Sequence, residues 1–309
     1  MSVRYNIASG IERGTKMTEG TARQVCDIVR FLLLSQRKDR VKRGFYWENQ
    51  IAFAFNSEKI EGSMLTEEQT RSIFETGTIA SGSPVPVDSV VEMRNHFRMF
   101  DLMLDTIDEP LTADLIKRFH GTLKEGEGAG EWKTIPNGVG GITTTAPADV
   151  DGAIARLLEA YGKRARTTCR DIVGFHVFYE RIHPFLDGNG RTGRMIMFRE
   201  CLRGGLVPFI VLDAEKAEYY RAIRTFEDDG GERFVRFAEH MAQLYLVEFS
   251  SLIPQNLLLP PLEEYVKHSS FDESDLSFFE QGALASWPMR WRSGSGFEAR
   301  AGIRLMECF

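Results

Sequence analysis

His183-Pro184-Phe185-Leu186-Asp187-Gly188-Asn189-Gly190-Arg191-Thr192-Gly193-Arg194 is the segment from which both the fold and the chemistry of this chain are predicted. It brings a base, a carboxylate, a glycine-bordered turn and two guanidinium groups into twelve residues. Taken singly these features are ordinary, because Gly-Asn-Gly is a common turn signal and an arginine in a first helical turn is usually solvated. A turn that only reverses the chain does not require all of them together. The segment therefore favours a site for a polyphosphate.

A helix is expected to end where this segment begins. Residues 171–182 repeat apolar side chains at spacings of three and four, which is typical of a helix with one buried face. Pro184 disfavours continuation, so His183 should stand at the C-terminal end of the helix. A lone histidine there is usually structural, but its reference pKa of about 6.5 also lets it be neutral at neutral pH and accept a proton.

A second helix is expected to begin near Asn189, because apolar residues recur after the turn. Gly188 and Gly190 permit positive φ and leave backbone N–H groups uncovered. The new helix N-terminus adds unpaired donors and a partial positive charge. The turn is therefore predicted to cradle an anion.

The charged residues of the segment suggest a division of roles. Arg191 and Arg194 are three residues apart, so they should project to one side of the first helical turn, and their fork geometry suits phosphate. Asp187 would repel a phosphate. It is better explained as a Mg²⁺ ligand, because Mg²⁺ is commonly held by one or two carboxylates and by substrate phosphate oxygens.

The composition fits a globular protein with a real core. Of the 309 residues 43% are hydrophobic, and length alone suggests two domains, although one large helical unit with a tail fits equally well. The formal net charge of −6 argues against a general nucleic-acid binder and makes the two arginines a local positive patch.

The cysteines and the hydropathy pattern favour a cytoplasmic protein. Four cysteines fall in no metal-ligand spacing, as expected in a reducing compartment. Residues 1–15 are polar and contain no apolar export segment, and no apolar run approaches membrane-spanning length. We therefore expect no contact with a membrane.

Helical periodicity covers most of the remaining chain up to residue 249. Residues 128–147 are the exception, because glycines break the pattern and a threonine run follows, which predicts a short β-hairpin. Residues 254–261 should form a linker, and the tail beyond them is expected to be peripheral or poorly ordered. Helices are expected at 17–40, 53–62, 67–76, 87–104, 112–123, 149–163, 171–182, 189–202, 213–226 and 232–249.

A second motif lies at the end of the helix expected at 53–62. Ser57 and Glu61 are four residues apart and share one face, and Gly62 follows in the position where glycine often ends a helix. By spacing alone, a solvent-exposed pair is the more common explanation.

Residues 183–194 resemble the signature of Fic-domain proteins, His-x-Phe-x-(Asp/Glu)-Gly-Asn-Gly-Arg-x-x-Arg, with every defining position filled. The similarity extends from about Asn56 to about Phe249. It implies a mainly α-helical fold, namely a Fic-type helical bundle with a small β-hairpin flap next to the active site. We therefore expect an N-terminal helical region at 1–85, a Fic catalytic domain at 86–250, and a linker and tail of unknown role at 251–309.

The resemblance also implies a reaction, the transfer of AMP from ATP to a Ser, Thr or Tyr hydroxyl of a target protein. His183 would be the general base, and Asp187 would hold Mg²⁺, or Mn²⁺ in its place. The loop Gly188-Asn189-Gly190 would bind the phosphates as an anion hole. Arg191 and Arg194 would hold the outer phosphates, and the buried aromatic residue of the signature would anchor the loop.

Ser57-x-x-x-Glu61-Gly62 resembles the inhibitory motif of the family, (Ser/Thr)-x-x-x-Glu-(Gly/Asn). Its position before the signature is similar to the subclass whose inhibitory helix, here about 47–61, acts within the same chain. The resemblance implies that Glu61 pairs with Arg194 and keeps that guanidinium from the γ-phosphate. Ser63 departs from the Asn that often follows in the family.

Several alternatives stay open at this point. Some members of the family remove AMP, using the inhibitory Glu to direct water, and a non-catalytic nucleotide sensor would use the same cradle. A flap that holds its target by main-chain pairing does not name the target protein or the modified residue. Self-modification and assembly into a homo-oligomer are also left open. Whether Tyr219 and Tyr220 contact the nucleotide is left open as well.

Overall fold

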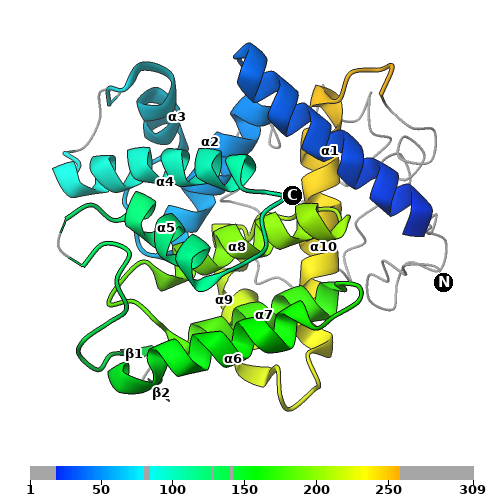
Figure 1. Cartoon of the computed structure of the whole chain (residues 1–309). Helices are drawn as coiled ribbons and strands as arrows, with labels where there is room; N and C mark the ends of the chain where they lie inside the picture. The colour runs from blue at the N-terminus through cyan, green and yellow to red at the C-terminus, as the bar shows by residue number, and fades with distance from the viewer. Residues whose placement is uncertain (1–18, 80–83, 127, 140–141, 258–309) are drawn as a thin grey trace, which may run out of the picture. The chain divides into compact units, whose positions relative to one another are not determined.

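The computed structural model describes residues 19–79, 84–126, 128–139 and 142–257. Within these ranges the chain is mainly α-helical, which confirms the predicted fold class (Figure 1). The described residues fall into two compact units, one made of residues 50–204 and the other of 19–49 with 205–257. The predicted regions with boundaries at 85 and 250 divide the chain differently and stay a prediction. The predicted tail beyond residue 257 lies outside the described residues.

The unit of residues 50–204 contains the signature and most of the helices. Capping boxes start two of them, with Thr66 and Gln69 at α3 and Thr168 and Asp171 at α7, so that N-terminal backbone donors find partners. The elements are α2 (Phe45–Ile60, which begins in the other unit), α3 (Glu67–Thr76), α4 (Val87–Asp105), α5 (Ala113–Leu123), β1 (Gly138–Val139), β2 (Ile142–Thr143), η1 (Pro147–Asp149), α6 (Val150–Gly162), α7 (Cys169–Ile182) and α8 (Asn189–Gly204).

Helix α8 is the centre of this unit, and α4, α5 and α7 pack against it. Gly193 lets α7 approach closely, because a Cβ at this position would lie 2.8 Å from the Glu180 Oε1 atom. On another side, the Phe198 ring contacts Phe53 and Phe100 at centroid distances of 5.2 and 5.7 Å. Helix α8 is thus packed against α7 on one side and against α2 and α4 on another.

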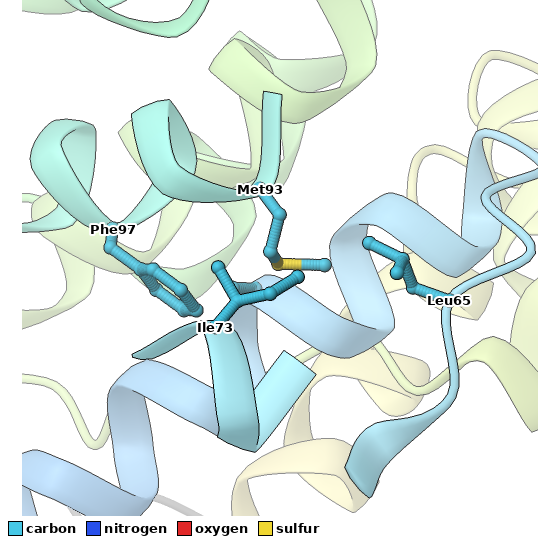
Figure 2. Close-up of a cluster of buried hydrophobic side chains, with 5 residues drawn as sticks. Leu65, Ile73, Met93 and Phe97 are labelled. Carbon is cyan, nitrogen blue, oxygen red and sulfur yellow. The ribbon is translucent and has the colours of Figure 1, made fainter. Parts of the chain in front are cut away.

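A smaller apolar cluster fixes the segment that follows α2. Leu65, Ile73, Met93 and Phe97 are buried together with Ala54 (Figure 2). These side chains come from α2, α3, α4 and the connection between α2 and α3. Burial of such side chains is worth about 1.5–3 kcal/mol each, so the C-terminal end of α2 is well anchored beside α4.

Strands β1 and β2 pair antiparallel, with Gly138 opposite Thr143 and Val139 opposite Ile142. Each strand has two residues, and residues 140–141 between them lie outside the described part of the chain. The pairing falls in the segment predicted to be a hairpin. Its role as a flap that binds a target stays a prediction.

The second unit has its own aromatic core. The Phe45 ring contacts Tyr245 and Phe249 at 6.3 and 5.7 Å, and the Tyr245 hydroxyl donates to Asn49 Oδ1 at 2.6 Å. Tyr219 is buried in this unit, so it serves packing. Its elements are α1 (Glu19–Asp39), η2 (Asp213–Glu215), α9 (Lys216–Thr225), α10 (Glu232–Phe249) and η3 (Ser250–Leu252). Across the described residues of both units, none of the helices combines the length and the apolar character needed to cross a membrane.

Candidate active site

His183 ends helix α7 in an unusual backbone conformation. Its φ and ψ are 50° and 63°, in the left-handed region, and its amide donates to Tyr179 O at 2.9 Å. A residue other than glycine pays roughly 1–2 kcal/mol for this conformation, so the surrounding structure must hold it there. Pro184, which cannot continue the helix, follows directly.

The His183 ring is oriented by the last turn of α7. Its Nδ1 lies 3.3 Å from the Glu180 carbonyl oxygen and 3.6 Å from the Glu180 carboxylate. An Nδ1–H that donates to Glu180 leaves the lone pair on Nε2, which is the arrangement that a general base requires. Burial alone would raise the pKa of Glu180, but the hydrogen bond with His183 and nearby positive charges lower it.

The turn between α7 and α8 is closed by a side-chain amide. Asn189 Oδ1 accepts from the Phe185 amide at 2.9 Å, and Asn189 Nδ2 donates to Phe185 O at 2.7 Å. The Phe185 ring is fully buried and stacks on the His120 imidazole at a centroid distance of 3.7 Å. Asn189 thus shapes the turn through its side chain, and its predicted phosphate contact rests on its backbone N–H.

His120 joins this turn to the segment before the hairpin. Its Nδ1 accepts from the Gly130 amide at 2.9 Å, so Nε2 carries the proton and donates to Asp187 O at 3.0 Å. The ring is neutral in this network. Burial, as the largest cause, lowers the pKa of His120 to about 4.

Acid should therefore loosen the turn, and a His120→Gln variant should show how much. Between pH 6.5 and 4 the unfolded chain binds a proton on His120 while the folded protein does not, so stability falls as the pH falls. We expect proton binding to His120 in the unfolded chain to lower the free energy of unfolding by about 1.5 kcal/mol between pH 6.5 and 5. Urea unfolding at both pH values measures it: the acid loss should be smaller in His120→Gln than in wild type. Equal losses in the two proteins would contradict this assignment.

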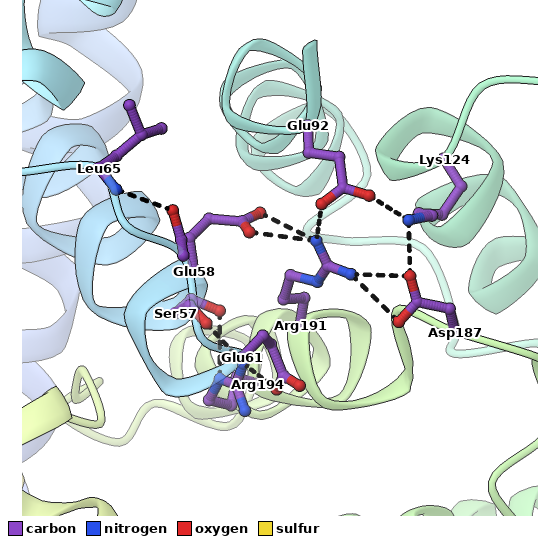
Figure 3. Close-up of polar contacts among 10 residues, drawn as sticks. Ser57, Glu58, Glu61, Leu65, Glu92, Lys124, Asp187, Arg191 and Arg194 are labelled. Carbon is purple, nitrogen blue, oxygen red and sulfur yellow. Dashed lines mark hydrogen bonds and ion pairs between the residues drawn. The ribbon is translucent and has the colours of Figure 1, made fainter. Parts of the chain in front are cut away.

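Helix α2 reaches Arg194 with its last turn (Figure 3). Arg194 Nε donates to Ser57 Oγ at 3.1 Å, and Arg194 Nη2 donates to Ser57 O and to Glu61 Oε1, both at 2.8 Å. Gly62 has φ 95° and the Ser63 amide donates back to Glu58 O, so α2 ends in a Schellman motif with Glu61 at the C-cap. The predicted pair of Glu61 and Arg194 is thus an ion pair in the structure.

The Glu61 carboxylate also lies against the N-terminus of α8. A Cβ built on Gly190 would fall 2.3 Å from Glu61 Oε1 and 3.0 Å from Arg194 Nη1, so only glycine leaves room for this contact. The first turn of a helix carries unpaired N–H groups and a partial positive charge, and it favours an anion. The carboxylate therefore stands where a phosphate oxygen of a ligand would be stabilised.

Arg191 donates to a different set of acceptors from those of Arg194. Its Nη1 donates to Glu58 at 3.1 Å and to Glu92 at 2.6 Å, and its Nη2 donates to Asp187 at 3.2 Å (Figure 3). Lys124 bridges Glu92 and Asp187, with 2.6 Å from its Nζ to Asp187 Oδ2. Arg191 is therefore a buried cross-link that joins α8 to α2, to α4 and to the turn, and its role differs from that of Arg194.

Asp187 is the exposed carboxylate of this cluster, with 63% of its side chain accessible. Burial alone would raise its pKa, but the Lys124 hydrogen bond and the Arg191 charge lower it to about 2. Asp187 is thus ionised and accessible, as a Mg²⁺ ligand must be. The described residues contain no group of three His, Cys, Asp or Glu side chains able to hold a metal.

The sequence did not single out several residues that build this site. Glu58 is buried on α2 directly after Ser57, and Glu92 is partly buried on α4, so both are charged residues in or beside apolar helix faces and carry a detectable signal. Lys124 and Lys133 resemble ordinary surface lysines in sequence. His120 carries no functional signal in the sequence either, because a histidine on an apolar helix face is usually a packing residue.

Comparison with known proteins agrees with the geometry. A model of the Fic/DOC family matches residues 110–201. The protein adenylyltransferase Fic of Drosophila grimshawi is 26% identical over 278 residues, which cover 84% of this chain and 54% of that protein. That of Drosophila melanogaster is 28% identical over 235 residues, 71% of this chain and 45% of that protein. The chain thus spans about half the length of these curated relatives.

Solved structures share the fold. A Fic-domain-containing signalling protein from Bacteroides thetaiotaomicron has a TM-score of 0.57 and 21% identity, over 77% of this chain and 96% of that one. Fic-1 from C. elegans has a TM-score of 0.57 and 20% identity, over 75% of each chain. The resemblance predicted from the signature is confirmed, and residues 110–201 of this chain are a Fic domain of the Fic/DOC family.

Proposed function

We propose that this chain is a protein adenylyltransferase that moves AMP from ATP to a hydroxyl side chain of a target protein, and that Glu61 holds it inactive. The observation that carries the proposal is the Glu61 carboxylate, which contacts Arg194 and Gly190 in the cradle at the start of α8. A carboxylate that occupies an anion site competes with an anionic ligand for that site. The names of the Drosophila relatives support the reaction.

The proposed reaction assigns one step to each group. The target hydroxyl oxygen attacks the α-phosphorus of ATP, His183 Nε2 takes the hydroxyl proton, and the bond from the α-phosphorus to the bridging oxygen breaks to release pyrophosphate. Backbone N–H groups of Gly188, Asn189 and Gly190 would stabilise the phosphate charge. Arg194 would hold the γ-phosphate once Glu61 has left it. Positioning and charge stabilisation suffice for such a transfer.

Asp187 would hold Mg²⁺, or Mn²⁺, and the bound metal would supply positive charge that stabilises the phosphates. Its exposed, ionised carboxylate fits this use. Lys124, however, donates to Asp187 Oδ2 at 2.6 Å. The ammonium and the metal would therefore compete for Asp187.

Lys124→Met should consequently lower the Mg²⁺ concentration needed for half-maximal AMP incorporation. Removing a positive charge next to a carboxylate that binds a cation should shift this concentration on the order of 10-fold. The measurement is a Mg²⁺ titration of labelling in Glu61→Gly protein with and without the second change. Lys117→Met, on the helix α5 that directly precedes Lys124, is the control and should not shift the titration. A higher Mg²⁺ requirement in Lys124→Met would mean that Lys124 assists the metal or the phosphates.

The direct test uses pure protein, labelled ATP and Mg²⁺. The enzyme proposal requires label on the Glu61→Gly protein or on an added target, and none on the Glu61→Gly/His183→Ala protein. Self-modification serves as the readout because the sequence does not name the target. A protein that binds ATP but never transfers label would be the non-catalytic nucleotide sensor, which is the alternative to an enzyme.

Removal of AMP is the second catalytic alternative. It is favoured by one observation, namely that the Glu61 carboxylate is partly exposed and lies in the cradle, where it could direct a water. Release of AMP from a pre-modified protein by wild type, lost in Glu61→Gly, would identify it. The predicted cytoplasmic location belongs to the same proposal, and it rests on the cysteine usage of the sequence.

A further inference from the structure

Lys133 is a buried lysine between the hairpin and the histidine end of α7. Only 3% of it is exposed, and its Nζ donates to Asn137 Oδ1 at 2.6 Å, Thr144 Oγ1 at 2.7 Å and Ile182 O at 3.2 Å. Among the described residues no carboxylate pairs with it. A buried ammonium is costly, and burial lowers the pKa of Lys133, so a residue kept only for packing would be better apolar.

The position of the ammonium explains how its charge is tolerated. Ile182 is the last residue of α7, so its carbonyl lacks an intrahelical partner and lies at the negative end of the helix dipole. Lys133 supplies the missing donor. It thereby binds the backbone directly before His183.

The backbone after His183 is bound from the same segment. The Lys133 amide donates to Pro184 O at 2.8 Å, and Asn137 Nδ2 donates to Phe185 O at 2.8 Å. Three carbonyl oxygens around His183 therefore accept from residues 133–137. These bonds hold the left-handed backbone of His183 in place.

The same ammonium donates hydrogen bonds to residues at both ends of the hairpin. Asn137 directly precedes β1, and Thr144 directly follows β2. The Thr144 hydroxyl also donates to Asn137 O at 3.0 Å. One side chain thus connects the base of the hairpin to the turn that carries His183.

We propose that Lys133 is a positioning residue for AMP transfer. It fixes the backbone conformation at His183 and the position of that backbone relative to the hairpin. The inference rests on the proposed function of the site. Lys133 acts through the peptide groups around His183, and the cradle on α8 and Arg194 are not among its partners. Its loss should therefore slow the transfer step and leave nucleotide binding intact.

The experiment compares Lys133→Met, Lys133→Arg and Thr144→Val, each in Glu61→Gly protein. Lys163→Met, at a lysine whose side chain is 72% exposed, is the matched control. The rate of self-labelling at saturating ATP and the Kd of a fluorescent ATP analogue are measured, together with hydrogen exchange of residues 183–189. Displacement of a catalytic group by about 1 Å can cost 10²-fold, so we expect Lys133→Met to label about 10- to 100-fold more slowly.

The other readouts separate positioning from general damage. The nucleotide Kd of Lys133→Met should stay within about 2-fold of the parent, and exchange of residues 183–189 should accelerate. Lys133→Arg should retain most of the rate, and Thr144→Val should show a smaller loss of the same kind. The inference would be overturned if Lys133→Met labelled and exchanged like the parent. It would also be overturned if its nucleotide affinity fell by as much as its labelling rate. Failure of the Glu61→Gly parent to label would instead count against the proposed function, while hydrogen exchange would still test Lys133.

Discussion

Replacing Glu61 by glycine should raise AMP incorporation by about 10²-fold, because it removes the anion that occupies the cradle. Breaking a buried ion pair can be worth about 3–5 kcal/mol, and the partial exposure of Glu61 places the effect at the lower end. An ATP phosphate must displace this carboxylate from Arg194 in wild type. In the variant the phosphate meets Arg194 and the N-terminus of α8 without a competing carboxylate.

The substitution should not damage the fold. Glu61 follows Ile60, the last residue of α2, so a glycine there does not interrupt a helix. Glu61→Gln tests whether charge or bulk inhibits: it keeps the size and the acceptor oxygen but not the charge, and we expect intermediate labelling. Glu109→Gly removes a glutamate from an exposed pair with Arg118 and is the control. Mass-detected AMP that is equal in wild type and Glu61→Gly would refute the inhibitory role.

The part of the site that was predictable is the part that is contiguous in sequence. Helix end, turn and helix start follow from Pro184, the glycines and the apolar spacing around them, and the structure has all three. The pair of Glu61 and Arg194 joins residues 133 positions apart, so spacing alone did not reveal it. It was expected only because Ser57-x-x-x-Glu61-Gly62 resembles a known inhibitory motif.

The partners of Arg191 show where prediction from one sequence stops. Residues three apart on a helix differ by about 60° in direction, and this difference sends Arg191 and Arg194 to separate sets of acceptors. The Arg191 acceptors Glu58 and Glu92 come from α2 and α4, and Lys124, which bridges Glu92 and Asp187, directly follows α5. Periodicity identifies the buried face of each helix but not which helices are neighbours. The sequence predicts Arg191 and Arg194 as a pair of phosphate-binding residues, and it does not indicate that Arg191 forms a buried cross-link between helices.

Lys133 illustrates the same limit for a loop. A lysine in a glycine-rich segment is normally solvated, and the sequence around it contains no carboxylate at a helical spacing that would suggest a buried pair. Its partners are carbonyl and hydroxyl oxygens, which every segment offers. Only the fold shows that α7 ends beside it.

His183→Ala in the Glu61→Gly protein should abolish most of the gain, with a fall in transfer rate of about 10²- to 10⁴-fold, the usual contribution of a general base. The reason is the orientation of the ring, whose Nδ1 is engaged by Glu180 and whose Nε2 is left to take the hydroxyl proton. Nucleotide affinity should remain, because the cradle and Arg194 belong to α8. The measurement pairs the rate of labelling with the Kd of a fluorescent ATP analogue.

A second variant separates chemistry from backbone conformation. The left-handed φ of 50° at residue 183 would also strain alanine, so a loss in His183→Ala alone does not distinguish a missing base from a displaced turn. Asparagine adopts this conformation more readily than alanine and lacks a comparable base. His183→Asn should therefore be as inactive as His183→Ala while keeping hydrogen exchange of residues 183–189 close to that of the parent. Substantial labelling by His183→Asn would remove His183 from the role of base and leave positioning by the cradle as the source of the rate.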